Sequence, residues 1–320
     1  MGRIEYTHKS WNPISGCLFG LPCWDRCWAR SMAKRLNGMG VDGYEGDYEE
    51  EWFGPRFHER RLGEVLDRLK PTRYAVGFMG DIALSGTHAI NLIFEVMHAC
   101  KQHRFLLLTK RPKMFADRVG TTGWAPMPHV WIGTSAGTQS EADERVPQLL
   151  AGFVGWHKWL SLEPMIGPVD LGRAGALPVY KEADTVTYRC GATQRVIGER
   201  PGKGWQKHDG NMTEWLDWVV LGGESGPQAR PMHMDWVRSV RDQCEAAGVP
   251  FWFKQWGEWA CVPDDHPDVT FVNIDGSIGH NGPPCPACMA KVGKKHAGNQ
   301  LDGEVIEQIP TDLLVDGEGE

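Results

Sequence analysis

The stretch FLLLTKRP at residues 105–112 has the pattern on which the fold prediction rests. Four apolar residues are followed at once by Thr109, Lys110 and Arg111, and then by Pro112. A short apolar run bounded by polar or turn residues is typical of a strand buried in a parallel sheet. Five further runs have this form, at residues 74–79, 130–132, 159–162, 218–221 and 249–253.

Segments with helical periodicity separate these runs. Strands that alternate with helices predict a parallel sheet. Together with an N-terminal strand near residues 4–8, the number of repeats favours a complete or partial β/α barrel of the TIM type over a doubly wound open sheet. The predicted helices cover residues 59–69, 88–103, 142–150 and 234–247.

Two parts of the chain depart from this alternation. Residues 172–212 lie between the fifth and sixth strands, counted from the N-terminal one, and are too long for an ordinary connection. They predict a lid or an inserted subdomain. The repeats end after Trp259, so we predict a barrel core over residues 1–259 and an irregular C-terminal extension over residues 260–320, packed on the barrel.

Polar residues follow nearly every predicted strand. In a β/α barrel the carboxyl ends of the strands meet at one mouth, where active sites are built. We therefore expect a polar pocket there, although each residue taken singly also suits a surface, helix-capping or core position. The candidate ligand-binding residues are Asp81, Lys110, Arg111, Glu163, Glu224, Ser225, Lys254 and Trp256.

Composition limits the class of protein. The net charge of -7 argues against a protein that coats nucleic acid through bulk positive charge. No apolar stretch reaches the roughly 18 residues that a membrane span needs, and the N-terminal sequence lacks the apolar core of a secretory signal. We expect a cytoplasmic protein without a membrane partner, whose cysteines are reduced thiols or metal ligands.

Three cysteines lie close together directly after the first predicted strand. Cys17, Cys23 and Cys27 fall within eleven residues, and a helix with Trp28, Met32 and Leu36 along one face is predicted from about Asp25. Cysteine thiolates hold iron–sulfur clusters, usually four per cluster, so three would leave one iron open. A zinc ion would need a fourth ligand from elsewhere. The third interpretation is three small apolar residues without a metal.

A second pair, Cys285 and Cys288, has the spacing of half a zinc site. Nothing in the sequence fixes its partners, and a turn with two free thiols fits as well. The candidate partners are Cys190, Cys261, His208 and His280.

Longer segments resemble an uncharacterised phage-derived family with a three-cysteine motif. Its members are similar to radical S-adenosylmethionine (radical-SAM) enzymes, with spore photoproduct lyase as a suggested distant relative. The segments that carry the resemblance are SWNPISGC (10–17), CWARSMAKRL (27–36), LLLTKRP (106–112), ADERVPQLL (142–150), LSLEPMIGPVDL (160–171), WVVLGGESGPQARPMHMDWVRSVRDQC (218–244), VPFWFKQWGEW (249–259) and KKHAGNQLDG (294–303).

This resemblance implies a barrel with a [4Fe–4S] cluster held by Cys17, Cys23 and Cys27 at its mouth. S-adenosylmethionine (SAM) would bind the open iron, and an external flavodoxin- or ferredoxin-like donor would supply an electron. Cleavage of SAM would then yield a 5′-deoxyadenosyl radical that abstracts hydrogen from the substrate. The likeness to photoproduct lyase suggests a nucleobase or nucleic acid as substrate, by analogy alone.

The chain departs from the radical-SAM pattern at three points. Its cysteines have the spacing C-x5-C-x3-C, where C-x3-C-x2-C is common. Met79, Gly80 and Asp81 stand where a Gly-Gly-Glu motif is usual, and Arg26 replaces the usual aromatic residue before the last cysteine. Two other classes therefore stay open: a zinc-stabilised nucleic-acid-binding protein, and a non-catalytic phage–host partner protein on the same barrel.

Overall fold

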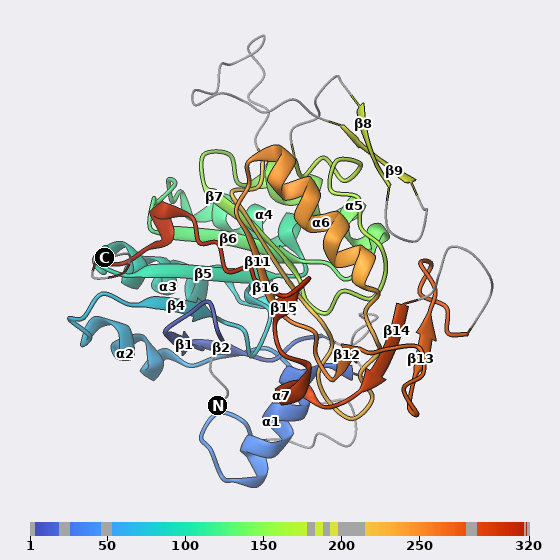
Figure 1. Ribbon diagram of the computed structural model, residues 1–320. Coiled ribbons are helices and arrows are strands. Elements are labelled where there is room, and N and C mark those ends of the chain that lie inside the picture. Colours follow the sequence, from blue (N-terminus) through green and yellow to red (C-terminus); the bar gives the residue numbers. More distant parts are fainter. Residues whose placement is uncertain are drawn as a thin grey trace. The chain divides into compact units, whose positions relative to one another are not determined.

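The computed structural model describes most of the chain (Figure 1). The described residues are 4–18, 26–45, 53–177, 183–187, 193–197, 215–279, 287–316 and 318. The chain divides into two compact units. The first consists of Met1–Thr134, Gly152–His157 and Thr311–Glu320, and the second of Ser135–Ala151 and Lys158–Pro310. The boundary predicted from sequence at residue 259 stays a prediction.

A sheet of seven strands has the order β1-β4-β5-β6-β7-β10-β11. Its pairings within the first unit and within the second are parallel. The α/β class is therefore confirmed, and an order that runs from β1 to β11 is consistent with a partial β/α barrel. The strands are β1 (Lys9–Trp11), β4 (Arg73–Val76), β5 (Arg104–Thr109), β6 (Val130–Ser135), β7 (His157–Leu162), β10 (Trp218–Gly222) and β11 (Phe251–Gln255).

Burial explains why the central strands read as continuous apolar runs. All residues of β4, β6 and β10 are buried, and Phe105, Leu106 and Leu107 of β5 have no exposed surface. Successive side chains of a strand point to opposite faces, so both faces of these strands are covered.

Helices of the first unit follow its strands. In α3, Ile90, Ile93, Phe94 and Met97 are buried at helical spacing, so one face of the helix packs inward. The helix α4 begins at Pro112, whose fixed φ and missing N–H suit a first helical position. No helix among the described residues is long and apolar enough to cross a bilayer. The other elements here are β2 (Ile14–Ser15), α1 (Trp28–Gly38), β3 (Arg56–Phe57), η2 (Glu59–Leu62), α2 (Gly63–Leu66), η3 (Ile82–Leu84), α3 (Thr87–Ala99), α4 (Pro112–Thr122) and η4 (Thr311–Leu313).

Two elements of this unit differ from the sequence predictions. The first strand begins at Lys9 rather than near Ile4, because Thr7 forms a turn in which its backbone N–H and hydroxyl both donate to the Ile4 carbonyl (2.9 and 3.2 Å). The helix predicted over residues 59–69 is the short 3₁₀ helix η2 followed by one α-helical turn, α2.

The second unit carries the long helix α6 at the bounds predicted for it, Met234–Ala247. A small antiparallel sheet of order β12-β14-β13 follows the last parallel strand, which the sequence did not predict. The remaining elements are α5 (Gln139–Gly152), β8 (Ala183–Thr187), β9 (Thr193–Ile197), β12 (Trp259–Cys261), β13 (Thr270–Val272), β14 (Ala287–Lys291), α7 (Lys294–Ala297), β15 (Gln300–Leu301) and β16 (Glu304–Val305).

The excursion over residues 172–212 is described only in part. Its described portion includes the antiparallel pair β8 and β9. Lid and inserted subdomain both stay predictions, because residues 178–182, 188–192 and 198–214 lie outside the described residues.

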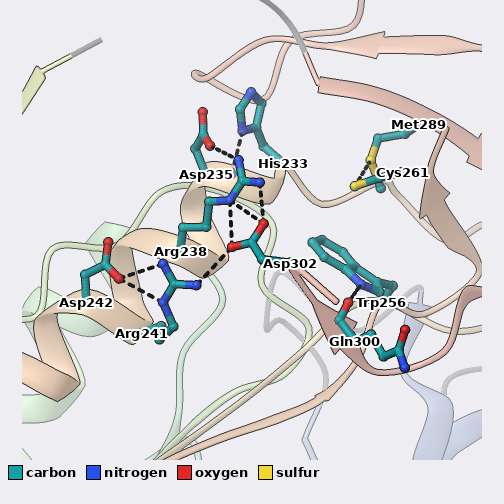
Figure 2. Close-up of polar contacts among 10 residues, drawn as sticks. All are labelled: His233, Asp235, Arg238, Arg241, Asp242, Trp256, Cys261, Met289, Gln300 and Asp302. Atoms are coloured by element: carbon teal, nitrogen blue, oxygen red, sulfur yellow. Dashed lines mark hydrogen bonds and ion pairs between the residues drawn. The ribbon is translucent and has the colours of Figure 1, made fainter. Parts of the chain in front are cut away.

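An ion-pair network ties the tip of the β15–β16 hairpin to α6 (Figure 2). Asp302, at a positive φ of 54°, accepts from Arg238 Nε (3.0 Å) and from Arg241 Nη1 (3.0 Å). Arg238 also bonds Asp235 (2.9 Å), and Arg241 bonds Asp242 (2.8 Å). Hydrogen bonds from Arg238 and Arg241 outweigh burial and lower the pKa of Asp302.

The variant Asp302→Asn is expected to lower the free energy of unfolding by about 1 kcal/mol at low salt. Asparagine tolerates a positive φ, so the change removes charge without straining the turn. Because the network is partly exposed, 1 M salt is expected to shrink the difference. Urea titrations at both salt concentrations measure it, with the exposed Asp264→Asn as control. An equal loss in the control, or a loss insensitive to salt, would contradict the assignment.

Candidate functional site

Asp81 is the centre of a polar cluster at the carboxyl ends of β4 and β5. Its carboxylate is buried, with 4% of the residue exposed, and receives several hydrogen bonds. Oδ1 accepts from Thr109 Oγ1 (2.6 Å) and the Ala83 N–H (3.2 Å). Oδ2 accepts from Arg111 Nη1 (2.7 Å) and the Lys110 N–H (3.3 Å). These hydrogen bonds replace those that the carboxylate would form with water if it were exposed.

Arg111 links Asp81 to the cysteine loop. The residue lies directly before Pro112 at the start of α4, and its N–H donates to Thr109 Oγ1 (2.9 Å). Its Nη1 lies 3.6 Å from Cys17 Sγ. Burial works to lower the pKa of Arg111, but the neighbouring Asp81 and Cys17 outweigh it and the pKa is raised. The guanidinium is therefore a fixed positive charge between a carboxylate and a thiol.

The backbone of the cysteine loop is held in a tight approach. Gly16 has a φ of 90°, and its carbonyl accepts from the Asp81 N–H (3.0 Å). A Cβ at position 16 would lie 1.9 Å from the Gly54 carbonyl oxygen. The next residue, Cys17, donates its N–H to the Phe53 carbonyl (2.6 Å). Position 16 therefore requires glycine, and these contacts fix the path of the backbone from Gly16 into Cys17.

Cys17 and Cys27 pack against one apolar cluster. Cys27 lies at the N-terminal cap of α1, and both cysteines are partly buried. Burial raises the pKa of the Cys17 thiol, Asp81 adds to the rise, and Arg111 opposes it. A thiolate at Cys27 would add to the rise, because two negative sulfurs repel each other. The buried members of the cluster are Ala29, Ala33, Tyr44, Phe53 and Met79.

These two thiols fit a centre with sulfur ligands, because they share one apolar surface and a cation, Arg111, contacts Cys17. Cys23 lies outside the described residues, as do Cys190 and Cys285. Within the described ranges no group of three His, Cys, Asp or Glu side chains has the arrangement of a metal site. The three-cysteine cluster and the zinc alternative both stay predictions.

A second polar group lies at the carboxyl ends of β7 and β11, in the second unit. Lys254 Nζ forms an ion pair with Glu163 Oε1 (2.6 Å), and the Ser161 hydroxyl donates to Glu163 Oε2 (3.1 Å). Both charged side chains are mostly buried. Gly222 ends β10 beside them, and a Cβ there would lie 3.2 Å from Glu163 Oε1.

The remaining predicted site residues of this unit differ in accessibility. Glu224 is buried and forms a fork with Arg230, from Nε to Oε2 (2.8 Å) and from Nη2 to Oε1 (2.9 Å). Ser225 is exposed. Trp256 is 5% exposed and donates its indole N–H to the Gln300 carbonyl (2.8 Å), as a core residue does (Figure 2). Ligand roles for these three residues stay predictions.

Comparison with models of protein families shows which family the chain belongs to. It belongs to the family described as "Protein of unknown function (DUF5131)". The family model matches residues 1–310. No curated protein and no solved structure matches the chain.

Three polar residues of these clusters are absent from the candidate ligand-binding residues named from the sequence, although Thr109 was noted directly after its strand. Thr109 bridges Asp81 and Arg111, Ser161 bonds Glu163, and Arg230 neutralises Glu224. Thr109 and Ser161 were visible as hydroxyls at the ends of apolar strands. Arg230 had no such signal, because it reaches Glu224 only when the glycine-rich turn folds back.

Proposed function

We propose that this DUF5131 protein is a radical-SAM-type enzyme. Cys17, Cys23 and Cys27 would hold a [4Fe–4S] cluster, with SAM on the iron that lacks a cysteine. The observation that carries the proposal is the pair of described thiols, Cys17 and Cys27, on one apolar surface beside the Arg111 guanidinium. When bound, a reduced cluster supplies the electron that cleaves SAM and starts hydrogen abstraction from a substrate.

The chain's own residues would position and shield this chemistry. The apolar cluster behind Cys17 and Cys27 excludes water from one side of the thiols. Lys110 would contribute a cation for a carboxylate or phosphate, next to Arg111 in the turn after β5 and with its backbone N–H bound to Asp81. The further residues proposed to contact SAM or substrate are Glu163, Glu224, Ser225, Lys254 and Trp256.

Two partners belong to the same proposal. An external flavodoxin- or ferredoxin-like protein would donate the electron. A nucleobase or nucleic acid would be the substrate, on the strength of the resemblance to photoproduct lyase.

Anaerobic purification followed by iron, sulfide and zinc analysis tests the proposal. We expect about four irons per chain and SAM cleavage only after reduction. Serine at Cys17, Cys23 or Cys27 should each lower the iron content severalfold, whereas Cys261→Ser, at an exposed position in β12, should not. A colourless protein with one zinc would support the zinc-stabilised alternative. A folded protein without metal would support the non-catalytic one, and either result would overturn the proposal.

A further inference from the structure

We propose that Arg111, held by Asp81, is a positioning residue that donates to the sulfur of Cys17 and thereby eases reduction of the centre that Cys17 helps to hold. The inference rests on the proposed function. It differs from the sequence prediction, in which Arg111 binds a carboxylate or phosphate of SAM or substrate.

The geometry gives Arg111 two partners at once. One nitrogen, Nη1, lies 2.7 Å from Asp81 Oδ2 and 3.6 Å from Cys17 Sγ. A guanidinium has donors in a rigid plane and keeps its charge at all pH values relevant to proteins. The side chain is 16% exposed, so water does little to weaken either contact.

Asp81 holds both ends of this contact. Its carboxylate, fixed by Thr109 and the Ala83 N–H, orients the guanidinium. Its backbone N–H binds the Gly16 carbonyl, directly before Cys17 in the chain. One residue therefore fixes both the cation and the loop that carries the sulfur.

A positive donor beside a ligating sulfur has a predictable electrostatic effect. Reduction adds negative charge to an iron–sulfur centre, and hydrogen bonds to the sulfurs stabilise that charge. Asp81 acts in the opposite sense, because its carboxylate is negatively charged. Loss of the Arg111 charge would leave Asp81 uncompensated and make reduction harder.

The test compares Arg111→Gln with the wild-type protein by electron paramagnetic resonance at a fixed potential. We expect the variant to keep more than half of its iron. Its ratio of reduced to oxidised cluster should fall at least tenfold. For a one-electron couple, a tenfold fall corresponds to a reduction potential lower by about 59 mV. Arg111→Lys should recover part of the change, because it restores the charge without the planar fork. Lys113→Gln removes a charge two residues away, from a side chain that is 70% exposed, and should leave the ratio unchanged.

The outcomes separate this inference from the proposed function. If Arg111→Gln binds iron with an unchanged ratio, or if Lys113→Gln has the same effect, the inference is wrong and the proposed function stands. If the wild-type protein binds no iron, the proposed function and the role in reduction both fail.

A double-mutant cycle tests the contact itself in metal-free protein. Cys17→Ala, Arg111→Gln and the double variant each change the unfolding equilibrium constant by some factor. The factor for the double variant should differ from the product of the two single factors by about threefold or more. Equality with that product would overturn the contact.

Discussion

Replacing Gly16 with alanine is expected to lower the free energy of unfolding by about 2–4 kcal/mol, the sum of backbone strain and overpacking. Gly16 has a φ of 90°, which side chains with a Cβ rarely adopt. The added Cβ would lie 1.9 Å from the Gly54 carbonyl oxygen. This neighbour is backbone, so it cannot rotate away as a flexible side chain would.

The matched control is Gly38→Ala at the end of α1. A Cβ at position 38 meets nothing within 4 Å, and the residue is exposed. Alanine there should be neutral or stabilise the first unit by up to about 1 kcal/mol. Urea unfolding of both variants, followed by circular dichroism, gives the comparison. Equal midpoints for Gly16→Ala and wild type would show that the loop relaxes freely around position 16.

Gly16→Ala also bears on the cysteine site. Because Cys17 follows directly and its N–H is bound to Phe53, any shift of residue 16 moves the thiol. We expect the folded fraction of the variant to retain less iron than wild type under the proposed function. Normal iron content in a destabilised variant would show that iron binding does not depend on the backbone geometry at residue 16.

Trp218→Ala is the second large effect, with an expected loss of about 3–5 kcal/mol in the free energy of unfolding. The residue has no exposed surface. Its ring lies 5.9 Å from that of Trp159 and 6.4 Å from that of Trp252, measured between centroids. Its indole N–H donates to the Gln308 carbonyl (2.8 Å), which truncation would leave without this donor.

Two variants separate packing from the hydrogen bond. Trp218→Phe keeps an aromatic ring but loses the indole N–H, so we expect a loss intermediate between wild type and alanine. Ile278→Ala truncates a side chain of the same unit that is 59% exposed and should change stability by less than about 1 kcal/mol. Chemical denaturation monitored by tryptophan fluorescence and circular dichroism measures all three. A loss for Trp218→Ala no larger than that for Ile278→Ala would contradict the packing described.

The parallel strands and part of the site were predictable from local pattern. Apolar runs at residues 105–108 and 218–221 became buried strands, because a strand covered on both faces needs no polar positions. Asp81 and Arg111 were expected at one end of such strands, and they form an ion pair there. Parallel strands bring their carboxyl ends to one edge of the sheet, so residues far apart in sequence meet there.

Other expectations failed or needed three-dimensional information. The stripe Trp28, Met32 and Leu36 does not mark the most buried face of α1. Met32 and Leu36 are partly buried against the apolar cluster, but Trp28 is 52% exposed and the fully buried residues are Ala29 and Ala33. Small side chains let a helix approach its neighbour closely, and hydrophobic periodicity does not weigh them. The small antiparallel sheet after Trp259 was also missed, because its strands of three to five residues carry too little pattern.

The amino-acid sequence by itself determined the alternation of strands and helices, the parallel sheet and the family, because each depends on local patterns of apolar residues or on similarity along the chain. Only the tertiary structure decided that Arg111 lies between Asp81 and Cys17, and that Glu163 is paired with Lys254. Such contacts join residues dozens of positions apart. The first of these contacts also depends on loop geometry at Gly16, where an added methyl group would collide with the Gly54 carbonyl.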